Sequence, residues 1–371
     1  MPGIANASFP SFLARLDASR VHRFHIRLVA VLGLCWLAAG YALALGPLLL
    51  GGVSTLAGAV FGALLGGWVA DRRGRIRAIA LALVWLALGG VVAQLAPAGD
   101  VLVAGRGIMG LGIGAVTLAS ALLVGELAPK AARGALVITL ASTFWAFGVL
   151  YATLVPVFAM TVLCFPILFF LRSIPESPRW LASRGRIIEA DAVVRRVERE
   201  AGGALITVAR VTPPAQAAAS SAPLSRRLTL ASWAGCAGAG ALIGGLASPL
   251  LAVALCLAAM FAAERAGRKP TLAVLLAAGA AALFAGAARE YVEAIGVAAL
   301  VVAALLAAES SPSRVRGRAM GLALALAWLV AILSAASNVP LVFAALAALG
   351  ALGVLLLAPE ARSRPLESVS G

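Results

Sequence analysis

The stretch Gly66–Arg75, GGWVADRRGR, separates one long apolar run from the next and returns in altered form two hundred residues later. The second copy, Glu264–Arg268 (ERAGR), keeps the acidic residue, two of the three arginines and the glycine of Asp71–Arg75 (DRRGR) in the same order. A charged cluster of this kind between two apolar runs is typical of a short turn at the end of a membrane helix. Its return predicts that the chain has two related halves.

A second element is repeated downstream of the first. Glu126-x-x-Pro129-x-x-x-Arg133-Gly134 corresponds residue for residue to Glu309-x-x-Pro312-x-x-x-Arg316-Gly317. Two motifs in the same order in both halves indicate six plus six helices related by a parallel repeat.

The composition indicates that the chain lies in lipid. Of its 371 residues, 62% are hydrophobic and 12% are charged, and the mean hydropathy is +1.02. Soluble domains are about 45–50% apolar and about 25% charged. A helix satisfies its own backbone groups, so such a chain is stable in a bilayer. The fold class is therefore predicted as an all-α polytopic membrane protein.

The distribution of Lys and Arg sets the number of crossings. Apolar spans of roughly the length that a membrane helix needs lie at about 28–49, 52–70, 78–97, 101–127, 135–154, 157–173, 228–246, 248–263, 271–288, 291–308, 319–337 and 340–358. With both termini in the cytoplasm, all but two of the 30 Lys and Arg residues, Arg106 and Arg289, lie on the cytoplasmic side. This agreement with the positive-inside rule predicts twelve transmembrane helices in a cell (inner) membrane. Several of the hairpins are unusually short.

The same map predicts the domain boundaries. They are a cytoplasmic tail at 1–27, a six-helix bundle at 28–173, a cytoplasmic central loop at 174–227, a second six-helix bundle at 228–358 and a cytoplasmic tail at 359–371.

Several other classes of protein are disfavoured. The net charge of +15 is divided among short clusters, with no basic helix for nucleic acid. The four cysteines lie in apolar runs without the spacing of a metal site. His22 and His25 both precede the first span, and no catalytic constellation is present in the sequence. We therefore expect no enzyme activity, catalytic residue, cofactor or metal.

These motifs resemble those of the major facilitator superfamily. GGWVADRRGR looks like the loop between helices 2 and 3 of such transporters, and the Glu-x-x-Pro-x-x-x-Arg-Gly element looks like the end of their helix 4. PESPRWL at Pro175–Leu181 and PEARSRPLE at Pro359–Glu367 resemble the sugar and organic-ion porter branch, and RFHIRL at Arg23–Leu28 resembles the aromatic-acid and niacin type. The resemblance implies two pseudo-symmetric six-helix halves and secondary transport by alternating access.

The charged motifs are candidates for gating. Gly67 allows two helices to approach closely. Asp71 is suited to accept helix N-terminal amides and to pair with Arg133, and Glu126 to pair with Arg75 or with arginines of the central loop. The resemblance implies that such clusters latch the cytoplasmic side in the outward-open state. The candidate gating residues are Gly67, Asp71, Arg72, Gly74, Arg75, Glu126, Arg133, Glu176, Arg179, Glu264, Gly267, Arg268, Glu309 and Arg316. For Arg72, Arg73 and Arg77 we favour a purely topological role.

Arg106 is the main candidate for substrate binding. It lies within an apolar span, in Leu102-x-x-x-Arg106-x-x-x-Gly110-x-Gly112, which resembles the Arg-bearing helix 4 motif of the superfamily. An ionisable group there is costly and indicates function. The alternative is that Arg106 reaches the outer interface near Asp100. The other substrate-binding candidates are Trp36, Tyr41, Trp145, Tyr151 and Trp233, and Gln94, Thr143, Trp328 and Asn338 are further cavity candidates; each aromatic taken alone is more typical of packing.

The substrate class follows from what the spans lack. The family resemblance implies acidic residues in helix 1 for the aromatic-acid type and glutamines in helix 7 for sugar porters. This sequence has neither, which disfavours a sugar and leaves no obvious carboxylate as a proton carrier. We predict a monomeric secondary transporter in the lipid bilayer for a small organic solute, preferably an organic anion such as an aromatic or other carboxylic acid, with protons as a candidate coupling ion. The alternatives are a non-transporting or degenerate paralogue acting as a membrane sensor or binding protein, and a sugar or organic-cation transporter.

Overall fold

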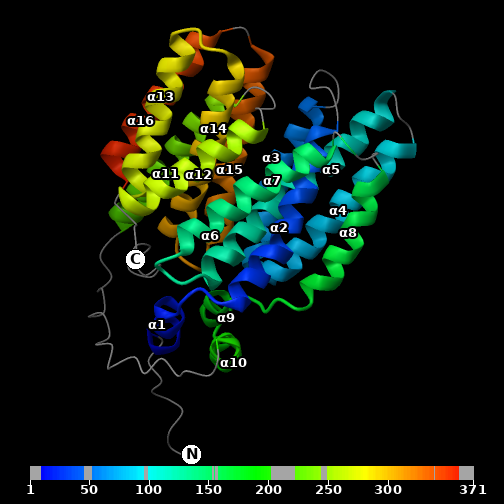
Figure 1. Ribbon diagram of the computed structural model, residues 1–371, viewed down its shortest axis with the longest axis vertical. Coiled ribbons are helices and arrows are strands. Elements are labelled where there is room, and N and C mark those ends of the chain that lie inside the picture. The colour runs from blue at the N-terminus through cyan, green and yellow to red at the C-terminus, as the bar shows by residue number, and fades with distance from the viewer. Residues whose placement is uncertain are drawn as a thin grey trace, which may run out of the picture.

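The computed structural model describes residues 10–45, 52–95, 99–152, 154, 158–201, 222–243, 249–337 and 339–358. Within these ranges the chain is helical and forms two adjacent bundles (Figure 1). The predicted C-terminal tail, the stretch 202–221 of the central loop and Asn338 lie outside the described residues.

The first bundle holds the first six predicted spans. Its elements are α2 (Arg23–Ala44), α3 (Val53–Arg73), α4 (Arg75–Leu95), α5 (Gly99–Leu127), α6 (Arg133–Thr139), η2 (Leu140–Phe144), α7 (Trp145–Ala152) and α8 (Phe158–Leu171). The elements α6, η2 and α7 follow one another without a break and together make the fifth span. The π-helical segment η2 widens this span at its centre.

The second bundle repeats this plan. Its helices are α11 (Ala222–Leu242), α12 (Pro249–Arg265), α13 (Arg268–Phe284), α14 (Arg289–Ser310), α15 (Arg316–Ala336) and α16 (Pro340–Leu357). Each predicted span therefore coincides with helical structure, which confirms the predicted fold class. Seven helices of the described chain are long and apolar enough to cross a membrane by themselves. Some helices are short: α12 and α13 have 17 residues each, about 26 Å of helix. The outer turns of the predicted short hairpins, at 46–51, 155–157 and 244–248, lie outside the described residues.

Three short helices lie at one end of the first bundle: α1 (Pro10–Ala18), α9 (Pro178–Ser183) and α10 (Ile187–Glu200) (Figure 1). The Ser177 side chain accepts a hydrogen bond from the Trp180 backbone N–H and so begins α9. The arginine motifs at the starts of α4, α6, α13 and α15 lie at this same level, which we call the charged end.

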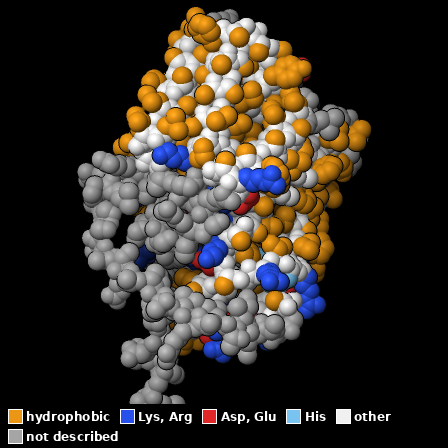
Figure 2. Space-filling model, turned by 60° about the vertical axis from the view of Figure 1, so that its left-hand side comes forward, with side chains coloured by type: hydrophobic (Ala, Val, Ile, Leu, Met, Phe, Trp, Pro, Cys, Tyr) orange, Lys and Arg blue, Asp and Glu red, His pale blue; other side chains and the backbone are white. Residues whose placement is uncertain are grey.

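The rest of the outer surface is apolar. Large hydrophobic side chains are exposed along the outward faces of the helices, for example Phe165 and Phe169 on α8 and Leu356 on α16. Figure 2 shows this apolar surface, with the blue Lys and Arg side chains of the visible face in its middle and lower parts. An exposed apolar surface around internally bonded helices is what a lipid solvent requires.

The two bundles touch through small residues. A Cβ atom added to Gly67 on α3 would lie 2.3 Å from the Gly317 carbonyl oxygen on α15, and one added to Gly317 would lie 2.5 Å from the Gly67 carbonyl oxygen. Because no side chain intervenes, the two backbones meet directly. This crossing brings the charged motifs of both halves together.

Candidate functional site

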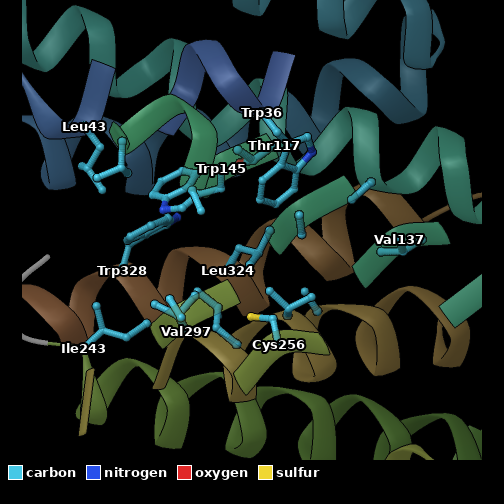
Figure 3. Close-up of a pocket in the computed structure, with 18 of the residues that line it drawn as sticks. Trp36, Leu43, Thr117, Val137, Trp145, Ile243, Cys256, Val297, Leu324 and Trp328 are labelled. Carbon is cyan, nitrogen blue, oxygen red and sulfur yellow. The ribbon is translucent and has the colours of Figure 1, made fainter. Parts of the chain in front are cut away.

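A central cavity lies between the two bundles. Trp36 of α2 and Trp145 of α7 line it from the first half, and Trp328 of α15 lines it from the second (Figure 3). Its volume is about 100 Å³, on a scale where one water-sized group needs roughly 10–15 Å³. The cavity therefore has room for a small ring compound.

The lining has few polar groups. Among the described lining residues none is charged, and most are Ala, Val, Leu and Ile. The Trp36 Nε1–H donates to Ser120 Oγ at 2.9 Å, and the Thr117 hydroxyl donates to the Ile113 carbonyl oxygen at 2.8 Å. Within the described chain no hydrogen bond is found for the indole N–H of Trp145 or Trp328. These two groups remain available to a solute.

The indoles form an aromatic wall. The rings of Trp36 and Trp145 meet edge to face with centroids 6.2 Å apart. Trp145 also packs on the cluster of Leu56, Ala59 and Trp328. Aromatic faces arranged in this way are suited to hold a planar ring.

Four of the six predicted substrate residues lie outside the described cavity lining. Tyr41 is buried and its ring contacts Tyr151 at 5.5 Å between centroids. Trp233 lies half-buried on α11. Arg106 is 8% exposed and donates to the Leu45 carbonyl oxygen at the end of α2. The structure thus brings Trp36 and Trp145 together at the cavity. Arg106 instead links α5 to the end of α2 by a hydrogen bond, and it lies neither in the described lining nor at an exposed interface.

At the charged end, a buried ion pair fixes the first half. Arg75 at the start of α4 donates Nε and Nη2 to the two carboxylate oxygens of Glu126, each at 2.9 Å. Its Nη1 donates to the Ala70 carbonyl oxygen at 2.9 Å. Both side chains are almost fully buried. A bidentate pair of this kind is rigid, and it costs much free energy to break one partner out of it.

Glu126 and a second carboxylate, Asp71, also bind residues of the second half. Arg316 of α15 donates Nη1 to Glu126 at 2.9 Å. Asp71 accepts the backbone N–H groups of Gly317 and Arg318, at 2.8 and 2.9 Å. Asp71 thus binds the N-terminus of α15, as the sequence suggested for a helix N-terminal amide.

One predicted pairing is wrong. Arg133 does not bind Asp71; its Nη2 donates to Asp17 of α1 at 2.8 Å, and its Nε donates to the Gly125 carbonyl oxygen at 3.0 Å. Asp71 lies instead near two other arginines, Arg318 at 3.5 Å and Arg75 at 3.8 Å. Asp17 also accepts from Arg179 at 2.7 Å.

The second half has the equivalent contacts. Arg268 lies 3.2 Å from Glu264 and 3.4 Å from Glu309. Glu264 accepts the backbone N–H of Ala135 at 3.1 Å, just as Asp71 accepts amides of α15. Arg133 lies 3.9 Å from Glu309. The repeat therefore extends from the sequence to the geometry.

The central loop caps this network. Glu176 accepts the backbone N–H groups of Arg75, Ile76 and Ser177 at 2.9, 3.2 and 2.9 Å. Burial raises the pKa of the Glu176 carboxyl above its ordinary value, against the opposing effect of these three donors.

Gly74 and Gly267 take positive φ angles of 99° and 108° at the helix joints, which only glycine adopts without strain.

Arg72 takes no part in the ion pairs of the described chain. Its guanidinium stacks on the Trp68 ring at 4.5 Å from the ring centroid. This position agrees with the topological role favoured from the sequence.

Sequence reasoning missed Asp17 and Ser120. Asp17 lies in the predicted tail, but Phe12, Leu13 and Leu16 of α1 are all buried. Their spacing is that of one helical face, a signal that a helix docks there.

Comparison with known proteins agrees with this geometry. The family model described as "Sugar (and other) transporter" matches residues 48–241. Probable inositol transporter 2 of Arabidopsis thaliana is 35% identical over 38% of this chain and 27% of its own length. The niacin transporter NiaP of Acinetobacter baylyi is 32% identical over 55% of this chain and 53% of its own length. The chain thus spans about half or less of the length of these curated relatives.

Among solved structures, the proton:xylose symporter XylE of the major facilitator superfamily, bound to 6-bromo-6-deoxy-D-glucose, superimposes with a TM-score of 0.67. The match covers 94% of this chain and 99% of XylE at 19% identity, so it concerns the fold alone. With the family model covering just over half of the chain, this chain belongs to the sugar (and other) transporter family.

Proposed function

We propose that this protein is a secondary transporter that carries a small organic solute through the central cavity by alternating access. The observation that carries the proposal is the position of the cavity between two repeated halves, with ion pairs across those halves at the charged end. Breaking those contacts would open the cavity toward the charged end. By the positive-inside rule the charged end faces the cytoplasm of a cell membrane.

The lining supports an aromatic solute that is uncharged when it binds. Three indoles surround the space, and no described lining residue offers a counter-charge to an anion. Moving a bare carboxylate into such surroundings costs several kcal/mol or more. We therefore refine the predicted aromatic acid: it enters in its protonated form and brings its own proton. Flux of the neutral acid is then proton-coupled without a carboxylate of the protein.

Sugars fit the described lining less well. The relatives include transporters that carry inositol and the sugar arabinose by name, and solutes with so many hydroxyl groups need many hydrogen-bond partners. Here the described lining offers mainly the indole N–H groups of Trp145 and Trp328 and the Thr117 hydroxyl.

Uptake by proteoliposomes tests the proposal. Labelled benzoate and labelled benzamide, which has no acidic proton, are compared at pH 5.5 and 7.5. We expect benzamide uptake to be independent of pH and benzoate uptake to rise at the lower pH. Binding without flux of either compound would favour the sensor alternative.

Two tryptophan variants connect uptake to the cavity. Losing one aromatic contact worth about 0.5–1.5 kcal/mol should weaken the apparent affinity by about 2- to 10-fold in Trp145→Ala and Trp328→Ala. The matched control is Trp85→Ala, because Trp85 is 45% exposed on α4. Equal effects of all three variants would reject the cavity as the route.

A substitution of Arg106 distinguishes binding of the neutral acid from binding of its anion. If Arg106 binds an anion, Arg106→Gln will abolish benzoate uptake and spare benzamide. We expect both solutes to change by the same factor, since Arg106 joins α5 to the end of α2.

A further inference from the structure

A groove lies on the outside of the first bundle between α4 and α8. Arg73 and Arg77 line it, together with Ala80, Leu81 and Val84 of α4 and Leu168 of α8. Arg73 is the last residue of α3, and Arg77 is in the first turn of α4. The chain turns at Gly74 between them with φ of 99°, so guanidiniums from two helices reach the same groove.

These two arginines differ from their neighbours. Arg75 is buried against Glu126, and Arg72 stacks on Trp68. Arg73 and Arg77 are exposed, and neither has an ion pair or hydrogen bond within the described part of the chain. Two cations without a partner among the described residues thus lie at the charged end of a groove whose other walls are apolar.

The internal repeat shows that topology alone does not require them. Aligning Asp71–Arg77 with the second copy places Ala266 opposite Arg73 and Pro270 opposite Arg77. The second half keeps its positive charge through Arg265, Arg268 and Lys269 instead. The pair at the groove is therefore a feature of the first half only.

We propose that this groove binds one anionic phospholipid. Its phosphate lies between Arg73 and Arg77, and an acyl chain runs along Leu81, Val84 and Leu168. Arginine binds phosphate through a planar set of donors, and basic pockets between membrane helices on the cytoplasmic side favour anionic head groups. The apolar wall commits the site to a lipid rather than to free phosphate.

Native mass spectrometry of the purified full chain tests the site, with phosphatidylglycerol, phosphatidylcholine and inorganic phosphate as probes. We expect phosphatidylglycerol to bind more tightly than phosphatidylcholine, and inorganic phosphate not to displace it. Arg73→Gln or Arg77→Gln should weaken phosphatidylglycerol binding by roughly 5-fold, and both together by roughly 30-fold.

The matched control is the double variant Arg265→Gln/Lys269→Gln, which removes two charges from the equivalent turn of the other half. It should leave the affinity for phosphatidylglycerol within about 2-fold of the unmodified chain, because Arg265 and Lys269 belong to the other half and do not line the groove. An equal loss in both double variants would show general charge attraction and overturn the proposal. Displacement of the lipid by inorganic phosphate, or equal affinity for both lipids, would overturn it as well. None of these outcomes depends on transport activity.

Discussion

Glu126 at the end of α5 and Glu309 near the end of α14 occupy equivalent places in the repeat, but they are held differently. Glu126 binds Arg75 through two bonds of 2.9 Å and Arg316 at 2.9 Å. The ion pairs of Glu309 are longer, at 3.4 Å to Arg268 and 3.9 Å to Arg133. By these distances, Glu126 holds its arginines more closely than Glu309 does.

The difference comes from outside the two bundles. Arg133, the counterpart of Arg316, donates to Asp17 of α1 at 2.8 Å. Arg15 of the same helix binds Asp191 of α10 at 2.8 Å, so α1 is attached to the central loop as well. The helix α1, which precedes the first bundle, thus binds Arg133, whose counterpart Arg316 binds a glutamate of the bundle instead. Equivalent residues in a repeated sequence therefore need not contribute equally to the free energy of unfolding. Four substitutions test this difference between the halves.

The largest effect is expected for Glu126→Gln. It would remove the negative charge that pairs with the buried Arg75 and Arg316. We expect the free energy of unfolding to fall by about 3–5 kcal/mol. The midpoint of thermal unfolding of the purified protein in detergent, followed by tryptophan fluorescence, should fall more than for any other single change in the network. A midpoint equal to that of Glu309→Gln would contradict the inequality between the halves.

Asp17→Asn should have the next largest effect. Asp17 accepts from Arg133 and Arg179 at 2.8 and 2.7 Å, and hydrogen bonds to charged groups contribute about 1.5–3 kcal/mol. The cost stays below that of Glu126→Gln, because α1 can detach and let water reach both arginines. Hydrogen exchange should show loss of protection in Phe12–Leu16 first. Unchanged protection there would mean that α1 is held by its apolar face alone.

Glu309→Gln should cost less, about 1–2 kcal/mol. Its ion pairs are long, and Arg133 keeps its bond to Asp17. The double variant Asp17→Asn/Glu309→Gln should therefore lower the unfolding midpoint by more than the sum of the two single changes. Simple additivity would show that Asp17 and Glu309 do not share Arg133.

The smallest effect is a pH dependence at Glu176. Because burial raises the pKa of this carboxyl above its ordinary value of 4.5, the folded state holds the proton more tightly than the unfolded state does. Stability should decline as the pH rises from about 4.5 through the raised pKa. Glu176→Gln should flatten this decline in the unfolding midpoint. A decline of the same slope in the variant would assign it to another group.

Much of the fold could be read from local patterns. Each predicted span contains helix, and the ends of α5 and α15 agree with the prediction to within a few residues. In lipid, an apolar run must form a helix because its backbone groups have no water to bind. Most arginines remain at one end of the helices, on the cytoplasmic side. The candidate site was less predictable. Trp36 and Trp145 line the cavity, whereas Arg106 does not. Which way a helix faces depends on its neighbours, and a single sequence does not contain that information.

By itself, the sequence determined a twelve-span helical membrane protein with a repeated pair of charged turns, because hydropathy and charge act residue by residue. Only the tertiary structure decided the partners: Arg133 with Asp17 rather than Asp71, Asp71 with the amides of α15, and three indoles around one cavity. Pairing of this kind depends on distances of a few ångströms between segments far apart in the chain. Those distances are fixed by packing, not by the order of the residues.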